Sequence, residues 1–386
     1  VKVGARKAYD EAVKQGKSKM FVVTKIDDKD ANFFNVLTEL KTVFGPTVCP
    51  VVVPVISNGS IVEYVNLIEM KAYKYDGKGN PVETEMPTAE ISEKFEYRID
   101  GLVAAVSEAV AETSDELMEK FFEGEAFTQK ELIDGIHEGM NRGIITPVVC
   151  TSAADLSGID MLLKEIELLL PAPNEVYPAE AYTPAKDIVE VACDKDSPLS
   201  AFVFKTIADP FVGKMSMIRV MSGKLTSNSD VINSATGATE KIGKLYSLCG
   251  KKQTEVSCAY AGDIVAAAKL QYTQTGDTLC DKANFIKYPE VDFPEPSLYM
   301  AVIPKNKGDD EKVGSGLHKL MEDDPSFVLT RNTETHQTLI GGQGEIQISI
   351  ITAKLKDKFG EGVDLIDQKI PYRETIKGSS DVQGKH

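Results

Sequence analysis

Two short loops in this sequence carry residue types that could bind a purine base. The first is Thr24-Lys25-Ile26-Asp27, which directly follows a short apolar segment at residues 20–23. Guanine presents two adjacent N–H donors, and a single carboxylate can accept both as a bidentate pair. Asp27 would therefore select guanine, because other bases leave its oxygens unpaired, and the Lys25 stem would lie along the base face. A strand that ends in an ordinary charged turn is the alternative interpretation.

The second loop, Thr151-Ser152-Ala153, follows a buried apolar segment at residues 144–150. Its small side chains would let backbone N–H groups approach a base carbonyl closely. Both loops would lie at the carboxyl ends of strands in one parallel sheet, which is where such sheets bind ligands. An ordinary strand-to-helix turn is again the alternative, so the two loops together leave both interpretations open.

The elements that must position these loops follow an alternating helix and strand pattern, which predicts a parallel α/β sheet. We expect helices at residues 3–15 and 30–44 and a strand at 20–23. The apolar run 48–56 is typical of one strand buried on both faces. Residues 57–143 interrupt the pattern with extended chain, an acidic helix near 90–112 and two capped helices that start at Ser114 and Thr128. This stretch is predicted to be an insertion.

The rest of the chain predicts further domains of different class. Residues 183–283 consist of short β-rich segments between glycine turns, which is typical of a β-barrel. Residues 284–297 are rich in proline and are interpreted as a linker. Strands and helices mix at residues 297–375, where 344–359 is assigned to a helix because of its length and its Lys-rich second half. Residues 376–386 would begin a following domain or form a loose tail.

Composition limits the classes of function. The 386 residues include 59 acidic and 43 basic side chains, and the formal charge of −16 argues against a protein that coats nucleic acid by charge alone. No apolar run reaches the ~18–20 residues of a membrane span, and the first residues do not form a signal peptide. The cysteines show no CxxC spacing and the histidines lie far apart. We therefore expect buried thiols in a reducing cytoplasm and no zinc site.

Three short motifs invite functional interpretations that their context does not support. The GKS tripeptide at residues 16–18 ends like a phosphate-binding loop, but Glu11 stands where that loop requires glycine. The DLSG sequence at 155–158 matches a magnesium-region pattern that recurs elsewhere in the chain by chance. The GGQ tripeptide at 341–343 repeats a release-factor motif without its context, and His318 and His336 have no evident partners.

Longer runs of sequence resemble bacterial elongation factor G and its paralogues over essentially all of the chain. FVGKMSMIRVMSGKL and TGDTLCD, within 183–283, are similar to the second domain of that family. PEPSLYMAVIPKNKGDDEKVGSGLHKLMEDDPSF and IPYRETIKG are similar to its third domain. EYVNLIEMKAYKYDGKGN resembles the insertion peculiar to this branch of translational GTPases. The resemblance implies that the guanine-specificity loop comprises Thr24, Lys25 and Asp27 and that the second guanine loop comprises Ser152 and Ala153.

The resemblance also implies a fold and an activity. The fold would be multidomain: part of a P-loop GTPase-type parallel α/β domain at 1–175 with an α+β insertion, a β-barrel domain and a ferredoxin-like α+β domain. The protein would be a cytoplasmic, monomeric, ribosome-dependent translational GTPase that binds GTP or GDP and no membrane, with ribosomal RNA and ribosomal proteins as partners.

The family's phosphate loop, switch regions and magnesium ligands should precede residue 1, and its fourth and fifth domains should follow residue 386. We therefore expect no catalytic or metal-binding residue in this chain and no hydrolysis by it alone. We expect an affinity for guanine nucleotides weaker than about 1 mM.

The chain departs from the family pattern at three places. The family usually has Asn at the position of Thr24 and Gly at that of Thr151, and its Gly-Met-Gly-Glu-Leu-His stands here as GQGEIQ at 342–347. These departures indicate a divergent paralogue. The alternatives are a ribosomal protection protein of the tetracycline-resistance type, which the insertion disfavours, and a non-catalytic ribosome-binding protein without a nucleotide pocket. A phosphate-loop motif encoded in frame upstream of residue 1 would argue against the latter.

Overall fold

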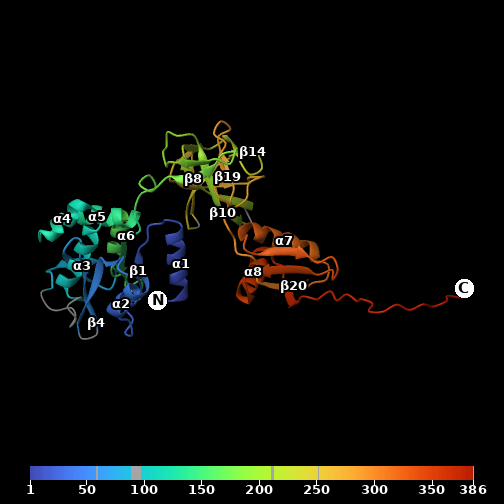
Figure 1. Ribbon diagram of the computed structural model, residues 1–386, viewed down its shortest axis with the longest axis horizontal. Helices are drawn as coiled ribbons and strands as arrows, with labels where there is room; N and C mark the ends of the chain where they lie inside the picture. The colour runs from blue at the N-terminus through green and yellow to red at the C-terminus, as the bar shows by residue number, and fades with distance from the viewer. Residues whose placement is uncertain (58–59, 88–96, 210–212, 251, 386) are drawn as a thin grey trace. The chain divides into compact units, whose positions relative to one another are not determined.

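The computed structural model describes residues 1–57, 60–87, 97–209, 213–250 and 252–385. The chain forms two compact units, Val1–Val176 and Tyr177–His386 (Figure 1). None of the helices in the described ranges is long and apolar enough to cross a membrane.

A three-stranded parallel sheet lies at the centre of the first unit, in the order β1-β7-β2. Its strands are β1 (Phe21–Val23), β7 (Thr146–Cys150) and β2 (Val48–Pro50), and the helices that alternate with them are α1 (Val3–Lys14), α2 (Phe33–Phe44) and α6 (Ile159–Leu169). The predicted α/β pattern is therefore present. The second helix starts later than residue 30, because the side chain of Asn32 caps it by accepting the N–H of Asn35 at 3.0 Å.

The apolar run at 48–56 forms two strands, so the prediction of a single strand was wrong. β2 ends at Pro50, and β3 (Val52–Ser57) belongs to a second, antiparallel sheet with β4 (Ser60–Asn66), β5 (Lys71–Tyr75) and β6 (Pro81–Thr84). Val51 joins the two sheets: its N–H donates to Val148 O at 2.8 Å, and its carbonyl accepts from Leu67 N at 2.9 Å. Strands of both sheets are formed from this run, so its uniform hydrophobicity does not mark the point where β2 ends and β3 begins.

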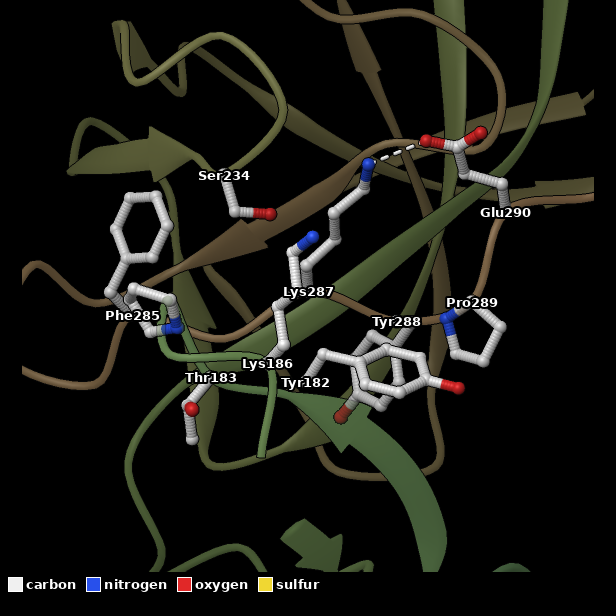
Figure 2. A pocket seen from close by; sticks show the side chains of 10 residues that line it. Tyr182, Thr183, Lys186, Ser234, Phe285, Lys287, Tyr288, Pro289 and Glu290 are labelled. Carbon is white, nitrogen blue, oxygen red and sulfur yellow. Dashed lines mark hydrogen bonds and ion pairs between the residues drawn. The ribbon is translucent and has the colours of Figure 1, made fainter. Parts of the chain in front are cut away.

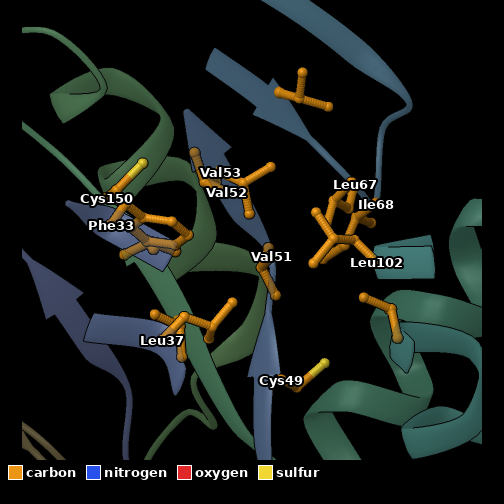
Figure 3. Close-up of a cluster of buried hydrophobic side chains, with 14 of the residues drawn as sticks. Phe33, Leu37, Cys49, Val51, Val52, Val53, Leu67, Ile68, Leu102 and Cys150 are labelled. Carbon is orange, nitrogen blue, oxygen red and sulfur yellow. The ribbon is translucent and has the colours of Figure 1, made fainter. Parts of the chain in front are cut away.

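Three helices complete the first unit: α3 (Ile99–Ala111), α4 (Asp115–Phe122) and α5 (Gln129–Asn141). The predicted starts at Ser114 and Thr128 are confirmed, the latter with a complete capping box formed with Glu131. The acidic helix predicted near 90–112 is described only as α3, since residues 88–96 lie outside the described ranges. Figure 3 shows Leu37, Val51 and Leu102, all fully buried, in the core that these elements share.

The second unit begins with the predicted β-barrel domain. Eight antiparallel strands form one sheet in the order β14-β13-β19-β10-β11-β18-β15-β16, and β12 pairs with β17. The bounds are β10 (Ser200–Asp209), β11 (Gly213–Ser222), β12 (Lys224–Thr226), β13 (Asp230–Asn233), β14 (Thr239–Lys241), β15 (Leu245–Cys249), β16 (Lys252–Val256), β17 (Cys258–Tyr260), β18 (Ile264–Ala268) and β19 (Thr278–Cys280). A hairpin of β8 (Ala179–Tyr182) and β9 (Ile188–Val191) precedes them.

The predicted linker at 284–297 is only partly a linker. Lys287 forms an antiparallel bridge with Tyr182 of β8, and Ile286 and Tyr288 are buried together with Ala181. The first half of this segment is therefore packed structure, because its alternating apolar side chains fill a small core beside the hairpin.

The last domain has the ferredoxin-like βαββαβ arrangement that was predicted. Its elements are β20 (Leu298–Pro304), α7 (Asp310–Asp323), β21 (Val328–Arg331), β22 (Thr338–Gly342), α8 (Glu345–Phe359) and β23 (Val363–Asp367), with sheet order β21-β22-β20-β23. The ambiguous segment 344–359 is a helix, as predicted. It buries Ile348, Ile351 and Leu355, which share one face at helical spacing.

Candidate functional site

The two candidate loops leave the central sheet side by side. Val23 and Cys150 are partners in the parallel pairing of β1 with β7. The pairing continues one step further, because the N–H of Thr151 donates to Val23 O at 2.9 Å. The fold thus brings together residues that are more than 120 positions apart in the sequence. This is the carboxyl edge of a parallel sheet, where ligands of open α/β sheets bind.

The first loop holds its polar side chains outward around one buried anchor. Ile26 is buried, while Thr24, Lys25 and Asp27 are exposed. Lys25 adopts a left-handed backbone conformation with φ of 58°, which reverses the chain directly after the strand. Within the described residues, the carboxylate of Asp27 makes no hydrogen bond and no ion pair. It is therefore a free acceptor at the edge of the sheet.

The second loop is held by buried residues and by a hydrogen bond within the loop. Thr151 and Ser152 are buried, and the N–H of Ser152 donates to Ser157 O at 2.9 Å. The amide of Ser152 is thus committed to the loop itself. Ala153 is exposed, and its N–H makes no hydrogen bond to the described part of the chain. Of the two residues expected here, Ala153 alone offers a free backbone donor.

Asp155, in the DLSG sequence that was set aside as a chance motif, shapes this second loop. Its carboxylate accepts the N–H of Ser157 at 3.1 Å. Burial raises the pKa of the Asp155 carboxyl, but hydrogen bonds from Ser152 and Ser157 outweigh burial and leave the pKa below its usual value. Gly158 closes the loop with φ of 73°, and a Cβ there would lie 2.7 Å from Cys150 O. DLSG is therefore a structural brace in this fold.

Two tyrosines of the inserted sheet contact the same loop, and the sequence analysis missed both. The hydroxyl of Tyr75 donates to Asp160 Oδ1 at 2.5 Å. Burial raises the pKa of Tyr64 well above its usual value, while a hydrogen bond with Ser157 lowers it. The two rings meet edge to face at 5.2 Å between centroids. No local sequence signal marks these contacts, because they join residues more than 80 positions apart.

A cavity of about 720 Å³ lies on the side of the first loop that faces the inserted sheet. Asp27, Tyr64, Asp155 and Ser157 contribute to its wall. Thr24, Lys25, Ser152 and Ala153 do not line it. A base held by both loops would therefore lie on the side of the loops that faces away from this cavity. The cavity is a separate space, with acidic residues in its wall.

The GGQ tripeptide at 341–343 is also structural. The side-chain amide of Gln343 donates to Glu295 O at 2.7 Å and to Pro294 O at 3.1 Å, and its N–H donates to Gln347 Oε1 at 2.7 Å. Gln343 therefore fastens the start of α8 to the segment before β20. Among the described residues, no group of three or more His, Cys, Asp or Glu side chains is arranged to hold a metal ion.

Comparison with known proteins identifies the domains of the second unit. Residues 198–282 match the family model of elongation factor G domain 2, and residues 293–366 match that of elongation factor G domain III. A β-barrel followed by this ferredoxin-like domain places the second unit among the domains of elongation factor proteins. More particularly, the chain belongs to the elongation factor G family.

A solved structure from the bacterium Thermus thermophilus resembles almost the whole chain. The two are 31% identical with a TM-score of 0.82, and the alignment covers 98% of this chain and 53% of the Thermus protein. The chain thus spans about half the length of that relative. The similarity extends over the first unit as well, where the two candidate loops lie.

Proposed function

We propose that the first unit is the C-terminal part of a P-loop GTPase-type domain. The intact protein would then be a cytoplasmic, ribosome-dependent GTPase that drives translocation or a related remodelling of the ribosome. The observation that carries the proposal is that the Asp27 carboxylate and the Ala153 N–H, which have no hydrogen-bond partner in the described part of the chain, stand on adjacent loops. The open edge of β1 agrees with it, since no described strand pairs with the outer side of β1.

The two groups account for recognition of guanine. Asp27 would accept both N–H donors on one edge of the base, and the N–H of Ala153 would donate to the base carbonyl. The aliphatic stem of Lys25 would cover the base face. Thr24 is shorter than the Asn usual at this position, so the loop depends more on Ile26, whose buried side chain anchors it.

Hydrolysis requires further groups. Phosphoryl transfer depends on residues that hold the β- and γ-phosphates and on magnesium, which neutralises the developing charge. In this proposal those groups belong to parts of the intact protein other than the residues described here. We therefore expect the isolated chain to bind guanine nucleotides more weakly than about 1 mM and not to hydrolyse GTP.

The replacement Asp27→Asn tests the proposal. In a protein that carries this chain together with the coding sequence upstream of Val1, the replacement should weaken GDP binding by roughly 10–100-fold, because hydrogen bonds to a charged group are lost. Binding of xanthosine diphosphate should strengthen, because the amide donates where xanthine accepts. Equilibrium titration with fluorescent GDP and xanthosine diphosphate measures both.

Asp28→Asn is the matched control, since Asp28 is also exposed but serves to bind the N–H of Asp30 at 3.0 Å. Its nucleotide preference should stay with guanine. An Asp27→Asn protein that still prefers GDP would show that the first loop is only a turn.

A further inference from the structure

A second cavity, of about 580 Å³, lies in the second unit between the β8–β9 hairpin and the segment that follows β19. Figure 2 shows its wall, where Lys186 and Lys287 lie near Ser234 and Phe285. Its volume falls within the range of small-molecule sites. Neither the family matches nor the candidate loops assign a role to it.

The floor of this cavity is preformed. Tyr182 and Lys287 exchange two backbone hydrogen bonds of 2.8 and 2.9 Å, which tie the hairpin to the segment. Tyr288 is buried, with its hydroxyl 2.7 Å from Ser200 Oγ, and burial raises the pKa of Tyr288 to about 12. A ligand would therefore meet a fixed surface and would lose little free energy in ordering it.

The two lysines of the cavity differ in whether a carboxylate neutralises them. Lys186 is exposed, and in the described ranges no carboxylate lies within ion-pair distance of its Nζ. The turn that carries it is fixed by the hydrogen bond from Lys186 N to Thr183 O at 2.9 Å. Lys287 is held by Glu290 at 2.5 Å, on the rim of the cavity. One positive charge is thus free and a second is partly neutralised.

The wall of the cavity combines these cations with a hydroxyl and flat apolar groups. Ser234 is buried in the wall, where its hydroxyl donates to Thr278 O at 3.3 Å, and the half-buried ring of Phe285 lies beside it (Figure 2). The ammonium groups of the lysines suit a phosphate, while a partly exposed aromatic ring suits a base that stacks on it. An uncharged apolar ligand would give Lys186 no anionic partner, and inorganic phosphate would make no stacking contact with Phe285.

We propose that this cavity binds one nucleotide, with its phosphate at Lys186 and Lys287 and its base against Phe285. The nucleotide comes either as a free monophosphate or as an unpaired residue of RNA, and both share the same recognition chemistry. The net charge of −16 on the chain opposes general RNA binding and leaves a local site of this kind as the point of contact. The proposal does not depend on the guanine loops.

The whole chain is titrated with fluorescein-labelled hexauridylate by anisotropy and with uridine monophosphate by calorimetry. Lys186→Ala should weaken binding about 3–10-fold and reduce the salt slope by about 0.7 for one lost phosphate contact. Phe285→Ala should weaken it roughly 5-fold or more through lost stacking. Glu290→Gln should strengthen it, because the replacement releases Lys287.

Lys224→Ala is the matched control: Lys224 lies over the ring of Tyr260 at 5.2 Å on the same domain, outside the cavity.

Binding of both probes with these changes supports a site for a nucleotide from either source, and binding of the oligomer alone supports RNA as the source. The absence of binding at about 1 mM probe would overturn the proposal, as would full competition by inorganic phosphate at equal concentration. Binding that is weakened equally by Lys224→Ala and Lys186→Ala would also overturn it. Phe285→Leu, which keeps the apolar volume, replaces Phe285→Ala if circular dichroism shows that the alanine variant has unfolded.

Discussion

At the scale of single residues, the buried carboxyl of Glu165 ties α6 to the inserted sheet. Its Oε1 accepts from Asn66 Nδ2 at 2.7 Å, and both side chains are fully buried. Its Oε2 meets no donor in the described part of the chain. Burial raises the pKa of Glu165 above its usual value, and the hydrogen bond from Asn66 only partly opposes this. Keeping this group charged therefore costs stability.

The replacement Glu165→Gln should reveal this cost as a dependence on pH. The native carboxyl binds its proton more tightly than the unfolded one, so it stabilises the fold below the unfolded pKa of about 4.5. That stabilisation is lost as pH rises through the native pKa. The unfolding free energy of Glu165→Gln minus that of the parent should therefore increase as pH rises above about 4.5, measured by urea titration with hydrogen exchange in α6.

Glu167→Gln on the exposed face of the same helix is the control, and its difference from the parent should stay flat over this range. A flat difference for Glu165→Gln as well would mean that the buried carboxyl is not destabilised by its charge.

At the scale of elements, the shape of the second candidate loop depends on the inserted sheet as well as on the loop itself. Hydrogen bonds of its own amide and carboxylate groups close the loop, and residues of the inserted sheet pack against it. A Cβ built on Gly79, in the turn before β6, would lie 2.8 Å from Leu156 Cβ. The insertion is therefore a structural support of the loop that presents Ala153.

Removing one hydroxyl should loosen this support. Tyr75→Phe deletes the bond to Asp160 and keeps the ring, so amides of residues 151–160 should exchange hydrogen about 3–10-fold faster, which is the loss expected for one hydrogen bond. Hydrogen exchange with mass spectrometry measures the change. Tyr73→Phe is the control, because its hydroxyl bonds to Glu69 at 3.2 Å, away from the loop. Equal exchange in both variants would contradict the role given to Tyr75.

The end of the same loop cannot accept a side chain. Gly158→Ala combines a left-handed backbone with a contact of 2.7 Å to Cys150 O. Gly124→Ala has a similar φ of 77° with nothing within 4 Å, so it isolates the backbone cost of about 1–2 kcal/mol. We expect Gly158→Ala to cost about 1–3 kcal/mol more through steric overlap. Urea unfolding of the two variants gives the difference, and equal costs would show that the loop moves aside freely.

At the scale of the whole molecule, the chain is built from separate cores. One cluster lies wholly within the first unit, and the others lie wholly within the second. The segment between them, at 171–178, is mostly exposed and carries Pro171, Pro173 and Pro178. Each unit therefore has hydrophobic cores of its own.

Fragments cut at this segment should fold separately. Residues 1–176 and 177–385 should each give a cooperative thermal transition, and the two circular dichroism spectra should add up to that of the chain. The fragment 1–143 is the control: it lacks β7, the central strand of the parallel sheet, and should be unfolded. A fragment 1–176 without a cooperative transition would show that the first unit needs the second.

Local signals explain which elements could be predicted from the sequence. Ser114 and Thr128 mark helix starts because each side chain caps its own helix. The spacing of Ile348, Ile351 and Leu355 selects helix for residues 344–359. The break at Val51 escaped prediction, since two sheets compete for one uniformly apolar run and only distant partners decide it.

By itself, the sequence determined the α/β pattern of the first unit, the β-rich segments of the barrel and the mixed strands and helices at 297–375, because these depend on periodicity, caps and residue type. The choice of Asp27 as the guanine-reading residue follows from residue type alone and stays a prediction. Only the tertiary structure decided that the amide of Ser152 is engaged, whereas that of Ala153 has no partner among the described residues. It alone also decided that Tyr64 and Tyr75 support the second loop and that Lys186 lies beside Lys287. Those facts depend on contacts between distant segments, whose register no local pattern encodes.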